Sequence, residues 1–112
     1  MNKEQKMGRI LVIDDDKDVL HAAQLFLKQH VENVQIEYNP KHIPNHLEEH
    51  DYDVVLLDMN FTDDVSSGEE GFFWLDKILE IDPSIAVVLI TAYGDIEKAV
   101  KAVKKGASDF VL

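Results

Sequence analysis

Carboxylates and one hydroxyl stand at the ends of three short apolar runs of this sequence. Asp14, Asp15 and Asp16 follow ILVI, Asp58 ends VVLLD, and Thr91 follows IAVVLI. Carboxylates held at close range repel one another, so ionising all of them costs free energy. A hard divalent cation relieves that cost, and Mg²⁺ prefers a few carboxylates together with phosphate oxygens. If the runs lie side by side, these residues predict a magnesium site suited to phosphoryl chemistry, whereas isolated runs would leave solvated loop acids.

The three runs must therefore be placed by a fold. They are rich in Val and Ile and apolar on both faces, which predicts strands buried in a parallel sheet. Helical spacings of apolar residues alternate with the strands, which predicts an α/β fold with a doubly wound parallel sheet. In such sheets sites form at the carboxyl ends of the strands. The expected order is strand 9–14, helix 17–29, strand 34–38, helix 41–50, strand 53–58, helix 71–80, strand 85–90, helix 95–105 and strand 109–112.

Several side chains are expected to pack against this sheet. Phe72 is expected in the core, whereas Trp74 could lie either in the core or at an interface. Pro44 is expected to interrupt helix 41–50. The apolar positions at helical spacing are Val19, Ala23, Phe26 and Leu27 in one helix, and Ile96, Ala99, Val100 and Val103 in another. The stripe formed by His42, His46 and His50 could bind metal, although a solvated face is favoured.

Length and composition limit the class of protein. The 112 residues suit one domain, 9–112, preceded by a polar tail, 1–8. The net charge of −11 argues against direct binding of nucleic acid by this segment. The sequence has no cysteine, no apolar signal segment and no apolar run long enough to span a membrane. We therefore expect a cytoplasmic domain.

Four blocks of the sequence resemble the receiver domain of two-component response regulators. They are ILVIDD at 10–15, VVLLD at 54–58, LITAYG at 89–94 and GASDFV at 106–111, and they occur in the family's order. The segment from Thr91 to Gly106 is most similar to receivers of the nitrogen-regulation type, which precede a sigma-54-activating ATPase. The resemblance implies a flavodoxin-like five-stranded sheet with strand order 2-1-3-4-5.

The resemblance also implies a role for individual residues. Asp58 would accept a phosphoryl group from a sensor histidine kinase, which makes the chain a phosphoacceptor signalling domain rather than an enzyme. Thr91 would contact the phosphoryl group and Phe110 would be the aromatic residue of the switch. The ligands of Mg²⁺ would be Asp14 through water, Asp15, Asp58, and the backbone carbonyl of Asn60. The switch would act on a C-terminal output domain, and a homodimer could form through helix 95–105 and strand 109–112.

Other interpretations remain open. A degenerate receiver could serve only as a docking module. The spacing of Asp14 and Asp16 also resembles the nucleophile motif of haloacid-dehalogenase-like phosphatases, although Asp18 does not fit that motif. Run 54–58 resembles a Walker B strand, but the sequence has no phosphate-binding Walker A motif. Asp58, Asn60 and Glu69 match three positions of an EF-hand calcium loop. Because a strand and not a helix precedes them, we interpret this match as a coincidence.

Two departures from the family pattern produce further expectations. Gly71 lies further from Asp58 than in most receivers, which implies an insertion within Thr62 to Glu70. Its acids could control access to the acceptor, although a passive surface loop is favoured. The sequence also stops just after Phe110, before the family's Lys and final helix. We therefore expect a truncated domain with impaired phosphorylation, an apolar patch around strands 9–14 and 109–112, lower stability and self-association.

Overall fold

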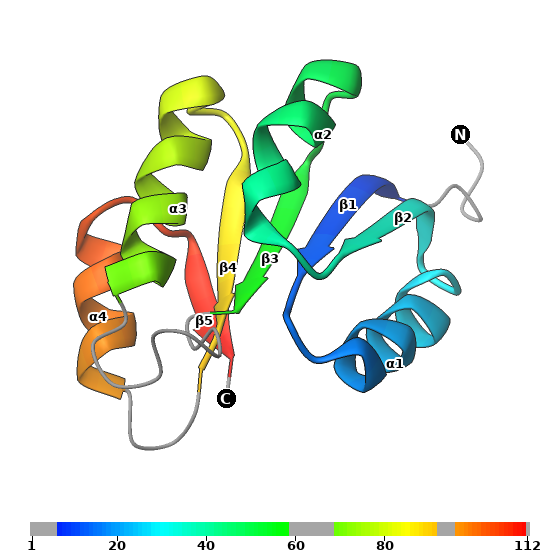
Figure 1. The fold of residues 1–112 in the computed structure, drawn as a ribbon, viewed down its shortest axis with the longest axis horizontal. Coiled ribbons are helices and arrows are strands. Elements are labelled where there is room, and N and C mark those ends of the chain that lie inside the picture. Colours follow the sequence, from blue (N-terminus) through cyan, green and yellow to red (C-terminus); the bar gives the residue numbers. More distant parts are fainter. Residues whose placement is uncertain (1–6, 59–68, 92–95, 112) are drawn as a thin grey trace.

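The protein forms one parallel sheet whose strands alternate with helices (Figure 1). The computed structural model describes residues 7–58, 69–91 and 96–111. The sheet has five strands in the order β2-β1-β3-β4-β5, which confirms the predicted topology. The elements are β1 (Met7–Ile13), α1 (Lys17–Leu27), β2 (Val31–Glu37), a 3₁₀ turn (Pro40–His42), α2 (Ile43–Glu49), β3 (Val54–Asp58), α3 (Glu69–Ile81), β4 (Ala86–Ile90), α4 (Ile96–Lys104) and β5 (Asp109–Val111).

The strand register aligns the carboxyl ends of neighbouring strands. Ile13, the last residue of β1, pairs with Glu37 of β2 and with Leu57 of β3. On the other side of β3, Asp58 pairs with Ile90 of β4. The residues that follow β1, β3 and β4 therefore emerge at one edge of the sheet, which we call the carboxyl edge.

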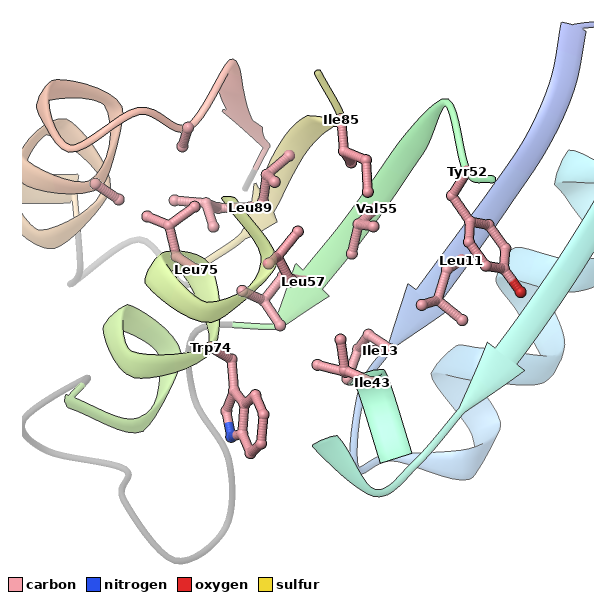
Figure 2. Packing of buried hydrophobic residues seen from close by; sticks show 14 residues of the cluster. Leu11, Ile13, Ile43, Tyr52, Val55, Leu57, Trp74, Leu75, Ile85 and Leu89 are labelled. Carbon is pink, nitrogen blue, oxygen red and sulfur yellow. The ribbon is translucent and has the colours of Figure 1, made fainter. Parts of the chain in front are cut away.

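One face of the sheet is closed by α2, α3 and α4. Alternate strand residues point into this face and are fully buried, among them Leu11, Val55 and Leu89. Figure 2 shows Leu57 and Leu89 on the side of the sheet that faces α3, whose Leu75 and Trp74 belong to the same core cluster. Trp74, which the sequence left open, is 8% exposed and belongs to this core. The α3 helix thus contributes packing rather than an aromatic interface at that position.

The opposite face is closed only in part. Ile10 and Val12 of β1 are buried against Leu20 of α1. Figure 1 shows α1 at one end of the sheet, away from α3 and α4. The residues of β3 and β4 that point to the same face are half-buried, namely Val54, Leu56, Ala86, Val88 and Ile90. The expected apolar patch is therefore wrong for β1, because α1 covers this strand, whereas Val111 of β5 is exposed.

The helices also pack differently from the expected apolar stripes. In α1, the predicted Ala23 and Leu27 pack with the buried Leu20 against the sheet, whereas the predicted Val19 and Phe26 are exposed. In α4, Ala99 and Ala102 are fully buried, whereas Val100 and Val103 are 43% and 39% exposed. The small alanine side chains therefore face the core, and the larger valines face outward. The expectation that these valines are core residues is wrong.

The region after β2 begins its helix differently from the prediction. Pro40 lies in a short 3₁₀ turn, and Pro44 lies in the first turn of α2. A proline in the first turn breaks no helical hydrogen bond, because the first N–H groups have no intrahelical partner. The expected interruption by Pro44 is therefore wrong, and the proline helps to start the helix.

Candidate functional site

The three acids that the sequence singled out lie together at the carboxyl edge. One carboxylate oxygen from each of Asp14, Asp15 and Asp58 lies within 4.8 Å of the other two. Asp14 and Asp58 are buried, and Asp15 is intermediate. The predicted convergence of the ends of β1 and β3 is thus present, and we call these three residues the acid cluster.

The strand ends hold the acid cluster in place through the backbone. The Asp14 N–H donates a hydrogen bond to the carbonyl oxygen of Glu37 at 3.2 Å, which extends the β1–β2 pairing by one residue. The Asp14 carboxylate accepts a hydrogen bond from the Asp16 N–H at 2.9 Å, which fixes the turn out of β1. The Asp16 carboxylate in turn accepts from the N–H groups of Asp18 and Val19 and caps α1. The third acid of the run therefore starts a helix and does not join the acid cluster.

Burial and neighbouring charge make the acid cluster unfavourable on its own. Burial raises the pKa of the Asp14 carboxyl above 3.8, and the hydrogen bond from the Asp16 backbone opposes that rise. The negative charges of Asp15 and Asp16 raise this pKa further. A carboxylate whose pKa is raised in this way is one that a positive ligand would stabilise.

The donor set fits a hard divalent cation. It consists of carboxylate oxygens only, within reach of one another, with the partly exposed Asp15 at its outer side. Mg²⁺ takes oxygen ligands and usually keeps several waters, so a cluster of a few carboxylates open on one side suits it. Asp14, Asp15 and Asp58 are the described residues that would hold Mg²⁺.

The remaining predicted site residues lie in other elements or outside the described residues. Thr91 is buried, and its N–H donates to the carbonyl oxygen of Val111 at 2.9 Å, so it follows β4 at the carboxyl edge. Phe110 lies in β5, is half-buried and packs against the core of the closed face. Asn60 lies outside the described residues. Most of the expected insertion, 62–68, also lies outside them, and Glu69 and Glu70 are the first residues of α3.

A second polar cluster lies at the end of β2, where Glu37, which the sequence did not single out, meets His42 and His46 of the predicted stripe. The Glu37 carboxylate accepts hydrogen bonds from His46 Nε2 at 2.8 Å and from His42 Nδ1 at 3.1 Å. The Asn39 N–H donates to the same carboxylate at 3.0 Å. The spacing of the two histidines is visible in the sequence, but no local pattern links them to Glu37. We call Glu37, His42 and His46 the histidine cluster.

Comparison with known proteins gives a consistent result along the chain. The family described as the response regulator receiver domain matches residues 10–112. The transcriptional regulatory protein ZraR of Escherichia coli K12 is 31% identical over 103 residues, which are 92% of this chain and 22% of ZraR. The C4-dicarboxylate transport transcriptional regulatory protein DctD of Rhizobium meliloti is 30% identical over 91% of this chain and 21% of DctD. The chain thus spans about a fifth of these relatives.

Solved structures agree with the sequence matches. The signal receiver domain of a two-component response regulator from Bacteroides fragilis superposes with a TM-score of 0.85 at 46% identity, covering 95% of this chain and 84% of that domain. NtrX from Brucella abortus superposes with a TM-score of 0.78 at 27% identity, over 92% of this chain and 23% of NtrX. No helix in the described part of this chain is long and apolar enough to cross a bilayer.

Proposed function

Because the chain belongs to the response regulator receiver family, we propose that it accepts a phosphoryl group on Asp58 from the phosphohistidine of a sensor kinase. The acceptor, the Mg²⁺ ligands and the kinase are parts of this proposal. The observation that supports it most directly is the convergence of Asp14, Asp15 and Asp58 within 4.8 Å. Two of these acids come from the end of β1 and the third from the end of β3, so the fold itself assembles the cluster.

The transfer would proceed by in-line displacement. A carboxylate oxygen of Asp58 attacks phosphorus, the P–N bond to the kinase histidine breaks, and the imidazole nitrogen keeps the electron pair of that bond. When bound at the acid cluster, Mg²⁺ would supply positive charge to the oxygens of the transferring group. Asp14 and Asp15 position that charge, while β3 positions the attacking oxygen. Placement and electrostatics account for most of the rate enhancement in such a reaction.

The signal would then pass through residues at the ends of β4 and β5. Thr91 follows β4 at the carboxyl edge, where its hydroxyl can donate to a phosphoryl oxygen. Phe110 on the neighbouring strand is half-buried, and the family resemblance implies that its ring moves inward together with Thr91. A new charge that draws Thr91 toward it would bias the position of Phe110. Asn60 completes the proposed metal site through its carbonyl, as the family resemblance implies.

The signal would control transcription through an output domain. The relatives ZraR and DctD are transcriptional regulators of which this chain matches only about a fifth. We propose an output domain of the sigma-54-activating type, acting in the cytoplasm. The exposed Val100 and Val103 of α4 and Val111 of β5 support the proposed homodimer, because apolar side chains at these positions are available to a second copy.

Phosphoryl labelling tests this function. The full-length protein is incubated with Mg²⁺ and ³²P-labelled acetyl phosphate, alongside Asp58→Asn and Asp51→Asn. Asp51 is an exposed acid ahead of β3, so its variant is a matched loss of one charge away from the acid cluster. The label should be lost in Asp58→Asn and kept in Asp51→Asn. Labelling that survives Asp58→Asn would move the acceptor elsewhere, and no labelling of the parent protein would favour a docking module.

A further inference from the structure

A lysine and a tyrosine lie next to the acid cluster, on the side of β2. Lys17 is the first residue of α1 and comes two residues after Asp15. Tyr38 directly follows Glu37, whose carbonyl oxygen accepts the hydrogen bond from the Asp14 N–H. The Lys17 ammonium lies over the ring of Tyr38, with Nζ 4.8 Å from the ring centroid. The two side chains therefore bridge the ends of β1 and β2 at the carboxyl edge.

The position of Lys17 is unfavourable for the helix itself. The first turn of a helix is the positive end of its dipole, so a cation there is disfavoured. Asp16 caps this end of α1, and Asp18 is the acid of its first turn. Among the described residues the ion pairs involve other lysines and histidines, and the Lys17 ammonium contacts the Tyr38 ring instead. Helix stability therefore does not account for a lysine at this position.

Exposure places the two side chains beside the approach to the acid cluster. Asp14 and Asp58 are buried, whereas Asp15 is partly exposed and so marks the open side of the cluster. Lys17 is exposed, and Tyr38 is 53% exposed. An exposed cation–π contact is weak, so the flexible lysine side chain can leave the ring at little cost. The ammonium is therefore available to a ligand that enters past Asp15.

The charge of the protein gives such a cation a use. The chain carries a net charge of −11. Acidic side chains crowd the ends of β1, β2 and β3, namely Asp14, Asp15, Asp16, Asp18, Glu37 and Asp58. A phosphodonor is itself an anion, so this field repels it as it approaches. A flexible ammonium beside the approach would offset that repulsion and donate hydrogen bonds to the oxygens of the phosphoryl group.

We propose that Lys17 is a substrate-contacting residue, whose ammonium moves from the Tyr38 ring to the oxygens of the phosphoryl group at the acid cluster. This proposal rests on the proposed transfer to Asp58 and adds to it a residue that binds the donor. Lys17 forms and breaks no covalent bond in the transfer. It contributes a charge-assisted hydrogen bond to the bound donor and then to the phosphoryl group on Asp58. Tyr38 fixes the place of the ammonium when no anion is bound.

The rate of phosphoryl labelling by acetyl phosphate tests this role. The full-length protein in Mg²⁺ is compared with Lys17→Gln, Lys17→Arg and Lys28→Gln. Lys28 follows the last residue of α1, so its variant removes the same charge at the opposite end of the helix. Lys17→Gln should lower kcat/KM by about fivefold, the upper range of an exposed ion pair, whereas Lys17→Arg and Lys28→Gln should match the parent. Added KCl should slow the parent more than Lys17→Gln, because salt screens the ion pair.

A second measurement follows the lysine directly by NMR. In the free protein, the ring current of Tyr38 should shift the ε-methylene resonances of Lys17 upfield of those of Lys28. Beryllium fluoride, which mimics a phosphoryl group on a carboxylate, should remove this shift when it is added with Mg²⁺. The same addition to Asp58→Asn should leave the Lys17 resonances where they were.

Three results would each overturn the proposal. The first is labelling of Lys17→Gln at the rate of the parent. The second is an equal loss of rate in Lys28→Gln, which would reduce the effect to net charge. The third is a Lys17 resonance that stays in place although beryllium fluoride shifts the resonances of the acid cluster. The proposed function fails differently, because then the parent protein takes no label or Asp58→Asn keeps it.

Discussion

The acid cluster and the histidine cluster lie at the same edge of the sheet, and the surroundings of their carboxylates are opposite. In the acid cluster, Asp14 lies beside other acids, and burial together with their charge raises its pKa. In the histidine cluster, burial alone would raise the pKa of Glu37, but hydrogen bonds from His46, the Asn39 backbone and His42 hold it below 4.5. The acid cluster therefore gathers like charges, whereas the Glu37 carboxylate of the histidine cluster accepts hydrogen bonds from neighbouring groups.

The difference is not one of backbone geometry, because the two groups share it. The Asp14 N–H donates to the carbonyl oxygen of Glu37 at 3.2 Å, so the two residues are neighbours across the β1–β2 pairing. The same sheet edge thus presents a carboxylate that destabilises the fold and one that stabilises it. The proposed phosphoryl chemistry belongs to the first, since closely spaced carboxylates favour a divalent cation, which in turn attracts the phosphoryl group.

The largest expected effect is stabilisation of the acid cluster by Mg²⁺. A ligand that binds only the folded state at a hundred times its Kd adds about 2.7 kcal/mol to the free energy of unfolding. We expect Mg²⁺ to raise the Tm of the parent protein and to have little effect on Asp15→Asn. Glu37→Gln should keep the full Mg²⁺ effect. A scanning calorimeter measures this, and loss of the effect in Glu37→Gln would mean that the two clusters are not independent.

The next largest effect is expected when the hydrogen bonds of the Glu37 carboxylate are removed. Glu37→Gln should lower the free energy of unfolding by about 1–2 kcal/mol at neutral pH, since hydrogen bonds to an ionised group are lost. The pKa of Glu37 is lowered in the folded state, so its stabilising contribution is present above pH 4.5 and is lost as the pH falls through the folded-state pKa. Urea unfolding in EDTA across this range should show the variant and the parent converging in acid.

The smallest expected effect is a gain in stability when a charge is removed from the acid cluster. In EDTA at neutral pH, Asp14→Asn should raise the free energy of unfolding by roughly 1 kcal/mol, because it removes a charge that the folded state disfavours. The pKa of Asp14 is raised above 3.8, so the parent loses stability as the pH rises through that raised value. The advantage of the variant should vanish in acid and shrink in Mg²⁺. A destabilised Asp14→Asn at neutral pH would contradict the comparison.

The sequence predicted the acid cluster better than the histidine cluster for a physical reason. Asp14 and Asp58 follow apolar runs directly, so the strand pattern alone places them at the carboxyl edge. The histidine cluster depends on a side chain at the end of β2 meeting a helix that starts beyond a 3₁₀ turn. Helical periodicity suggested a stripe of three histidines, but the helix ends before His50. No local pattern shows that Glu37 fills the space beside the remaining two.

The same limit applies to packing. The order and type of the elements follow from short Val- and Ile-rich runs that alternate with helical spacings, and the strand order was confirmed. The rotation of a helix about its axis was not predicted, because it depends on which side chains fit the sheet. In α4 the alanines face inward and Val100 faces outward, although hydrophobicity alone would place the valine inside. Shape complementarity decided between them, and a single sequence does not contain it.

The strand order also determines when the acid cluster comes into existence during folding. No two paired strands are joined by a hairpin, since β1 pairs with β2 and β3 only across intervening helices. Such pairings close long loops and are slow to form. Asp14 and Asp58 approach each other only after the chain from α1 to α2 has folded back and β3 has docked on β1. A partly folded chain thus has no assembled acid cluster, and this metal affinity arises only with the completed β1–β3 pairing.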